Sequence, residues 1–337
     1  MEPVTAVHDP ELTARVVSRA PLLYAAGADP ALDRPAHVRA GSGVSWVAGC
    51  LAVVQDDASF VALVDPATRE VRAVTLPAGE DGKRQFDALR GTKGLKLDLE
   101  CCVTVPEGGG ELLLAWGSGS TARRERVALL EGWTEGRPEV TVVDASALYA
   151  RLRARTEFSG SELNVEGAVF VDGCVRLFGR GNGAPRNGVL PMDATCDLEW
   201  EALRAYLRDP AHAPPPEPRS VVRYRLGALD GLPLTFTDAT AAGGRVVFSA
   251  AAEDSPDATR DGRVAGSALG VIDAPGRARW TVLRDAEGWS FPDKVEGVAL
   301  SPGSAGRAYA VVDRDDPAVP SELLEVELAG PWGVAGG

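Results

Sequence analysis

The sequence contains few of the groups on which most metalloenzymes and hydrolases depend. Its three histidines, His8, His37 and His212, all lie outside the repeated hairpins described below. This argues against a zinc or iron centre with imidazole ligands. No GxSxG segment occurs, so a serine hydrolase with a nucleophile elbow is not expected. Residues 179–183 (GRGNG) lead from one predicted strand toward another rather than into a helix, so no nucleotide or organic cofactor is expected.

Basic residues are outnumbered by acidic ones, 35 to 48. The formal net charge is −13, which disfavours binding to nucleic acid or to an anionic membrane surface. No run of 18 apolar residues indicates a membrane span, and the first residues lack the basic and apolar regions of a secretory signal. The five cysteines are odd in number and form no CxxC pair. This indicates reduced thiols and predicts a cytoplasmic location.

What the sequence does contain is a repeated hairpin pattern. Each copy has an apolar strand, a glycine-containing turn and a second apolar strand that ends in polar residues. The copies open near residues 42, 97, 163, 234 and 293. They are about 60 to 70 residues apart, a spacing typical of repeat architectures. Two further strand-like runs follow each of the first four hairpins; in the third unit they are residues 188–192 and 220–226.

The last unit has only three strands, and residues 13–26 could supply the missing one. A chain whose N-terminal strand completes its last repeat forms a closed ring without exposed sheet edges. The sequence therefore predicts an all-β fold, with one β-propeller domain over residues 1–337. Five blades are favoured, and six are the alternative if a long insert hides one. Residues 147–156 and 198–209 have helical patterns and are expected to lie outside the blades.

A carboxylate interrupts the apolar first strand in four of the five units. These acids are Glu100, Glu166, Asp238 and Glu296, and Ser42 takes this place in the first unit. The first strand of each propeller blade lines the central channel, so the four acids are expected to point into one axial channel. Such neighbours repel each other and raise their own pKa values. They could be protonated, could pair with Lys96, Lys294 or an arginine, or could be metal ligands. Ca²⁺, which takes six to eight oxygen ligands, is the candidate ion.

Two other interpretations stay open at this point. Each inner-strand acid could simply accept hydrogen bonds from backbone N–H groups of the next blade. The second-strand ends and nearby residues would form a mixed polar mouth: Asp56, Asp57, Ser118, Arg123, Arg124, Arg180, Asn182, Lys294 and Asp313. Arginines in such a mouth would hold an anionic ligand through paired hydrogen bonds. The alternative is a solvated rim of surface ion pairs.

Several segments resemble a bacterial β-propeller family without assigned function. They are DLECC, LNVEGAVF, FTDAT and DKVEGVAL, together with GSGSTARRERV and FGRGNG. That family is similar to the phytase-like and "esterase-like activity of phytase" propellers, and the likeness covers residues 36–328. It implies a propeller fold and, for the phytase-like relatives, Ca²⁺ and phosphoester chemistry in an acidic channel mouth. By this resemblance Glu100, Glu166, Asp238 and Glu296 are the blade-opening acids, whereas Ser42 and Cys101 depart from the pattern.

The sequence thus favours a monomeric binding propeller without turnover. Its acidic mouth would bind a divalent cation, a small anionic ligand or a protein partner. One alternative is a metal-dependent phosphoester or ester hydrolase, in which the ion activates water and an acid serves as general base. A second is a glycoside hydrolase with a carboxyl pair about 5–5.5 or 6.5–9.5 Å apart. Nucleic acid and membrane are not expected partners.

Overall fold

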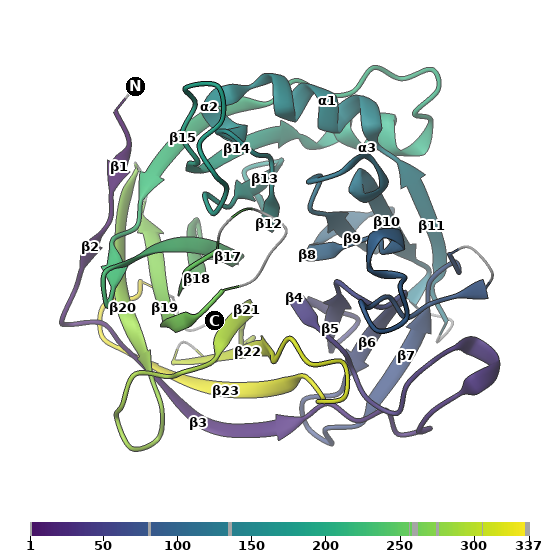
Figure 1. Cartoon of the computed structure of the whole chain (residues 1–337), viewed down its shortest axis with the longest axis horizontal. Helices are drawn as coiled ribbons and strands as arrows, with labels where there is room; N and C mark the ends of the chain where they lie inside the picture. The colour runs from purple at the N-terminus through teal and green to yellow at the C-terminus, as the bar shows by residue number, and fades with distance from the viewer. Residues whose placement is uncertain are drawn as a thin grey trace.

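The protein is built almost entirely from strands (Figure 1). The computed structural model describes residues 2–79, 82–133, 137–255, 257, 262–273, 276–304 and 306–333. The strands form curled sheets around a common axis, and the propeller-like architecture confirms the predicted all-β class. The expected single domain over residues 1–337 stays a prediction and includes residues outside the described ranges.

Three sheets follow the predicted units, with antiparallel strands paired in chain order. The first contains β4 (Gly41–Val47), β5 (Cys50–Gln55), β6 (Phe60–Val64) and β7 (Val71–Thr75). The second contains β8 (Leu99–Glu107), β9 (Gly110–Gly117), β10 (Arg126–Glu131) and β11 (Glu139–Asp144). The third contains β12 (Val165–Val171), β13 (Cys174–Gly179), β14 (Asp193–Glu199) and β15 (Arg219–Arg225), with β1 (Val4–Thr5) parallel to β15.

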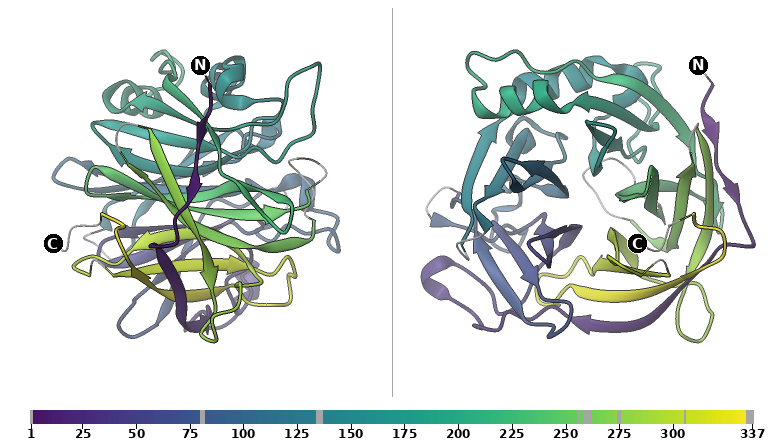
Figure 2. Two further views of the ribbon diagram at one scale, coloured as in Figure 1. Left: turned by 90° about the vertical axis from the view of Figure 1, so that its left-hand side faces the viewer. Right: turned by 180° about the vertical axis from the view of Figure 1, so that it is seen from behind.

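The fourth and fifth predicted units share one ten-stranded sheet. Its strands are β16 (Ala228–Leu229), β17 (Leu232–Ala242), β18 (Arg245–Glu253), β19 (Val264–Asp273), β20 (Arg277–Arg284), β21 (Lys294–Leu300), β22 (Arg307–Asp313), β23 (Glu322–Ala329), β2 (Val7–His8) and β3 (Thr13–Pro21). Strand β3 pairs antiparallel with β23 along its length and parallel with β20 at Ala14 and Arg15 only. The N-terminal segment therefore runs along the outside of the molecule and pairs in turn with β15, β20 and β23 (Figure 2).

Two predicted strand positions are wrong in detail. The predicted N-terminal strand, residues 13–26, ends at Pro21, because Leu23 and Tyr24 make only isolated bridges. Residues 188–192 were expected as the third strand of the third unit, but this strand is Asp193–Glu199. Its partner on one side is β13, with Cys174 opposite Glu199. Local hydrophobicity in GVLPM suggested a strand, and the proline in it has no N–H to donate.

The hydrophobic core forms five clusters, four between neighbouring sheets and one between the two halves of the ten-stranded sheet. Such face-to-face packing is expected for sheets whose strands bury apolar side chains on both faces. Cys101 and Cys102 illustrate the alternation. Cys101 packs between the second and third sheets and Cys102 between the first and second, and both are buried. They serve as small apolar core residues, as their positions predicted.

The helices cover the outside of the second and third sheets (Figure 1). They are α1 (Ser146–Ala154), α2 (Thr156–Ser159) and α3 (Trp200–Arg208). Asp144 accepts a hydrogen bond from the Ser146 N–H, and the Glu199 side chain caps α3. Short 3₁₀ turns occur at Pro30–Leu32, Lys93–Leu95 and Ala122–Arg124. Within the described residues, none of the helices has both the length and the apolar character needed to cross a membrane.

Candidate functional site

The first strands of the five units share one irregularity. In each, the pairing with the second strand skips one residue, as in a β-bulge. The skipped residues are Ser42, Glu100, Glu166, Thr237 and Glu296. A bulge turns its extra side chain out of the regular alternation, so a polar residue avoids the core between the sheets. Asp238 is therefore one residue away from the position equivalent to the other acids.

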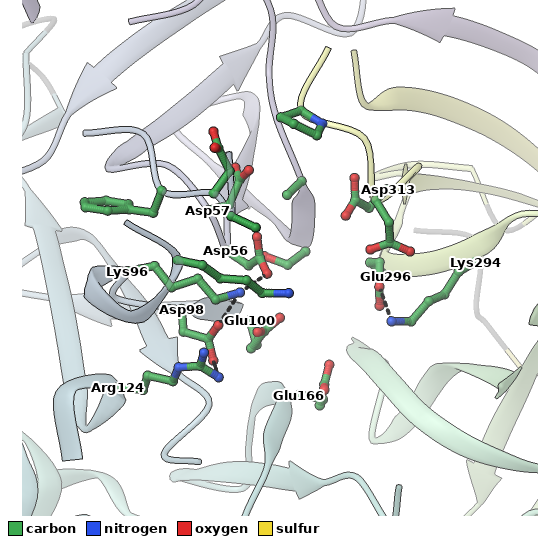
Figure 3. Close-up of a pocket in the computed structure, with 18 of the residues that line it drawn as sticks. Asp56, Asp57, Lys96, Asp98, Glu100, Arg124, Glu166, Lys294, Glu296 and Asp313 are labelled. Atoms are coloured by element: carbon green, nitrogen blue, oxygen red, sulfur yellow. Dashed lines mark hydrogen bonds and ion pairs between the residues drawn. The ribbon is translucent and has the colours of Figure 1, made fainter. Parts of the chain in front are cut away.

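Three of these acids border a cavity of about 240 Å³ at the axis (Figure 3). This axial cavity is lined by Ala40, Ser42, Asp56, Asp57, Phe86, Asp87, Ala88, Leu89, Lys93, Lys96, Asp98, Glu100, Arg124, Asn164, Glu166, Arg180, Asn182, Lys294, Glu296, Asp313, Asp315, Asp316 and Pro317. Among the described residues, ten carboxylates and five cationic side chains line it. The wall is therefore strongly negative.

A first cluster of charges, the Lys96 group, lies on one side of the cavity. It consists of Lys96, Asp56, Asp98, Glu100 and Arg124 (Figure 3). The Lys96 ammonium pairs with Asp56 and lies 2.6 Å from Oδ1 of Asp98, whose Oδ2 lies 2.9 Å from Arg124. Burial opposes ionisation of Asp98, but Lys96 and Arg124 outweigh it and lower the pKa of Asp98.

Glu100 is the carboxylate of the Lys96 group that lacks a partner. It makes no hydrogen bond or ion pair with any other residue in the described part of the chain. Burial, followed by the charges of Asp98 and Glu166, raises the pKa of Glu100 well above its usual range. A cation beside Glu100 would remove this cost, because an opposite charge favours the ionised carboxylate.

The second cluster, the Lys294 group, lies opposite. It consists of Lys294, Glu166, Arg180, Glu253 and Glu296. The Lys294 ammonium is 2.7 Å from Glu296 and 3.2 Å from Glu253. Arg180 lies 2.6 Å from Glu253 and 3.4 Å from Glu166. Glu253 lies behind the cavity wall and holds both cations in place.

Unequal environments separate the pKa values of these acids. Burial alone would raise the pKa of Glu253, but Lys294 and Arg180 outweigh it and lower that pKa to about 2. Burial raises the pKa of Glu296 to about 8, because Lys294 only partly compensates and the charge of Glu166 adds to the effect. Glu296 is therefore protonated in a large fraction of molecules at neutral pH.

Asp313 and Asp57 complete the negative wall. Burial and the neighbouring charges, Asp315 first, raise the pKa of Asp313 well above its usual range. Burial and Asp56 raise the pKa of Asp57 to about 7, although Asp57 pairs with the guanidinium of Arg39. Several carboxylates from different sheets thus oppose each other's ionisation across one cavity.

Asp238 has a different environment. It does not line the axial cavity and is fully buried in β17. Its Oδ2 accepts hydrogen bonds from the backbone N–H of Val298 (3.0 Å) and Val44 (3.5 Å), which lie in β21 and β4. Burial outweighs these bonds and raises the pKa of Asp238 well above its usual range. Asp238 thus takes the role that the sequence left open for all four acids, that of a backbone acceptor between sheets.

The other expected residues divide between the cavity and its surroundings. Seven of the expected mouth residues line the cavity: Asp56, Asp57, Arg124, Arg180, Asn182, Lys294 and Asp313. Ser118 is buried behind the wall and donates to Asp98, and Arg123 is exposed and does not border the cavity. Asp98, Asp87 and Asn164 also line the cavity, although they were not expected from the sequence. Asp98 had a signal, since it stands two residues before Glu100 and lies on the same side as that acid.

Three carboxylates lie close enough together to hold a metal ion. Single oxygens of Asp56, Asp98 and Glu100 all lie within 4.8 Å of one another. Ca²⁺ requires six to eight oxygens at about 2.3–2.6 Å. The Lys96 ammonium already lies against Asp56 and Asp98, and the second oxygen of Asp98 faces Arg124. Ca²⁺ bound by all three acids would have to displace this buried ammonium, so the arrangement as it stands does not fit Ca²⁺.

Comparisons with known proteins give a family and a fold. The profile described as "Family of unknown function (DUF6929)" matches residues 37–328. No curated protein matches the chain. A GH43 β-1,3-galactosidase structure is similar at 11% identity, with a TM-score of 0.50 over 91% of this chain and 59% of that one. A luciferin-regenerating enzyme is similar at 12% identity, with a TM-score of 0.45 over 88% and 95%.

Proposed function

Since the chain belongs to DUF6929, a family of unknown function, we propose its role from the fold and the cavity. We propose a five-bladed β-propeller, closed by β3, that binds a cation in its axial cavity. The contacts between first strands support this fold: β4 lies against β8, β8 against β12, β12 against β17, β17 against β21, and β21 against β4. The pairing of β3 with β23 supplies a fourth strand to the fifth unit.

One observation carries the functional proposal: carboxylates from opposite sides of the cavity oppose each other's ionisation. The charge of Glu166 in the Lys294 group raises the pKa of Glu100 in the Lys96 group, and the charge of Asp56 raises the pKa of Asp313. Neighbouring carboxylates that repel each other are stabilised by a cation placed between them. The cavity therefore has the charge and the room for a positively charged ligand.

The charges do not favour an anionic ligand, which the sequence analysis had also considered. Arg180 is engaged by Glu253, Glu166 and Thr235, and Arg124 by Asp98 and Ser120. Guanidinium groups that are already paired with buried carboxylates have few N–H donors and little unbalanced charge left for a phosphate. The phytase-like alternative needs an anionic phosphoester in this cavity, so it is supported only by the resemblance of the blade-opening segments.

Glycoside hydrolysis is a weaker proposal. The GH43 galactosidase has a similar fold at 11% identity, a likeness that carries no active-site residues. Glu296, with a pKa of about 8, has the protonation state of a general acid at neutral pH. Glu253, which shares the Lys294 ammonium with Glu296, lies behind the cavity wall and is not placed to contact a substrate. Binding of a protein partner, a monomeric state and a cytoplasmic location also stay proposals.

The proposal is tested by thermal unfolding with added ligands at constant ionic strength. The panel is CaCl₂, MgCl₂, MnCl₂, 1,4-diaminobutane and, as the anionic comparison, sodium phosphate. A ligand at 100 times its dissociation constant stabilises the folded state by about 2.7 kcal/mol. We expect at least one cation to raise the unfolding temperature and phosphate to have no effect.

The matched variants are Glu100→Gln and Glu139→Gln, which remove the same charge inside and outside the cavity. Glu139 lies exposed on β11, far from the cavity lining. We expect Glu100→Gln to reduce the response to the cation and Glu139→Gln to leave it unchanged. If no cation stabilises the protein, or if both variants respond alike, the proposed function is wrong.

A further inference from the structure

The axial cavity has two separate carboxylate clusters, each built around a lysine ammonium. Lys96 lies among the acids of its group and Lys294 among those of the other, and Figure 3 shows the two on opposite sides of the cavity. Each group contains three carboxylates and two cationic side chains, as defined above. Each group thus contains one carboxylate more than it has cationic side chains.

A single small ion cannot compensate both sides. Among the described residues, Asp56, Asp98 and Glu100 are the one set of three acids whose ligand atoms all lie within 4.8 Å of one another. Glu166 and Glu296 are not part of this set. An ion held by these three acids would have neither Glu166 nor Glu296 in its ligand set.

Asn164 gives an independent indication of a ligand. Its side chain lines the cavity and is only 4% exposed. The amide nitrogen donates to Glu166 (2.7 Å) and Asn182 (3.3 Å), whereas Oδ1 accepts no hydrogen bond from any residue in the described ranges. An amide oxygen at the cavity wall without a protein donor can accept a hydrogen bond from a ligand N–H group.

The size and the remaining wall also suit an organic molecule. A volume of about 240 Å³ is far larger than the space that a single water molecule or metal ion needs. Beside the charges, Phe86, Ala88, Leu89 and Pro317 contribute apolar surface. Of these, Leu89 is exposed.

We propose that the ligand is an organic dication with two ammonium groups joined by a short hydrocarbon chain. One ammonium group contacts Glu100 in the Lys96 group, and the other contacts Glu296 and Oδ1 of Asn164. The hydrocarbon chain lies between them along the apolar wall. Both groups are protonated at neutral pH, since alkylammonium pKa values lie near 10. This inference rests on the proposed function, because it specifies the cation that the cavity binds.

The test is isothermal titration calorimetry on the full chain with probes that differ in one feature each. They are 1,3-diaminopropane, 1,4-diaminobutane, 1,5-diaminopentane, butylamine, 1,4-butanediol, CaCl₂ and MgCl₂. We expect at least one diamine to bind about tenfold or more tightly than butylamine, because a second charged hydrogen-bonded contact is made. The diol should not bind.

Two variants locate the two ends of the ligand. Glu100→Gln and Glu296→Gln should each reduce diamine affinity to that of butylamine, whereas Glu139→Gln should not. The comparison of diamine, monoamine and diol in the unmodified protein does not depend on whether the variants fold.

The outcomes separate this inference from the proposed function. If a metal ion binds through Glu100 and diamines bind no better than butylamine, the dication is wrong and cation binding stands. If neither metal ions nor amines bind, both are wrong. Diamine binding that survives both substitutions would also overturn the inference, because the ligand would then lie elsewhere.

Discussion

Glu253 is the residue through which the charge network can be tested most directly. Its carboxylate is 7% exposed and contacts Arg180 at 2.6 Å and Lys294 at 3.2 Å. Its other oxygen accepts a hydrogen bond of 2.8 Å from the Gly262 N–H. Glu253→Gln keeps the size of the side chain and removes the charge. Two buried cations then lose a shared counterion, so the variant should be much less stable.

The magnitude follows from the pKa shift. The pKa of Glu253 is lowered from 4.5 to about 2, and one pKa unit corresponds to about 1.4 kcal/mol. Ionised Glu253 therefore stabilises the folded state by about 3 kcal/mol at pH 7. This agrees with the range of about 3–5 kcal/mol for breaking one side of a buried ion pair. Because the folded pKa is the lower one, the contribution is complete above pH 4.5 and is lost as the pH falls toward 2.

Denaturant unfolding of the unmodified protein and Glu253→Gln at pH 7 and pH 3 measures both effects. We expect a difference in unfolding free energy of about 3 kcal/mol at pH 7 and less than half of that at pH 3. Glu139→Gln, an exposed substitution, should change stability by less than about 0.5 kcal/mol. A Glu253→Gln difference below about 1 kcal/mol at pH 7, or one that does not depend on pH, would refute the reasoning.

Three further substitutions test other parts of the structure. Gly43→Ala should destabilise by about 1–3 kcal/mol in urea unfolding, since its Cβ would lie 2.7 Å from the Cα of Cys101, whereas Gly94→Ala, with open space around it, should not. Asp238→Ala should lower stability by about 1–3 kcal/mol, because two buried backbone N–H groups lose their acceptor; an unchanged melting temperature would contradict its role. The folded pKa of Glu296 is raised to about 8, so its contribution to stability is lost as the pH rises from about 4.5 through 8. Between pH 5 and pH 8.5 the melting temperature of Glu296→Gln should therefore fall less than that of the unmodified protein. Equal decreases would contradict this pKa.

The acids in the first strands show what sequence patterns can and cannot locate. The repeated segments predicted four channel acids, and three of them, Glu100, Glu166 and Glu296, line the axial cavity. The pattern equated Asp238 with the other three acids, but the equivalent bulged residue in its strand is the preceding Thr237. A bulge depends on the pairing with the second strand, so the sequence of one strand does not specify which residue is skipped.

The charge of the cavity shows a second limit. The sequence offered arginines at the expected mouth, and an anionic ligand was one interpretation. In the structure Arg180 and Arg124 are engaged by Glu253, Glu166 and Asp98. Counting charged residues near a site does not say which are already paired, because pairing depends on which strands become neighbours.

The sequence by itself determined the all-β class, the repeated four-strand pattern and the segments that carry the cavity acids. Alternating apolar residues, glycine turns and a regular spacing are local signals, so they can be recognised without knowledge of the fold. Only the tertiary structure decided which polar groups meet across the axis. It left Glu100 without a partner and gave Asp238 to the backbone N–H groups of β4 and β21. Those contacts join residues far apart in the chain, and burial in their surroundings, rather than residue type, decides which carboxylates are ionised.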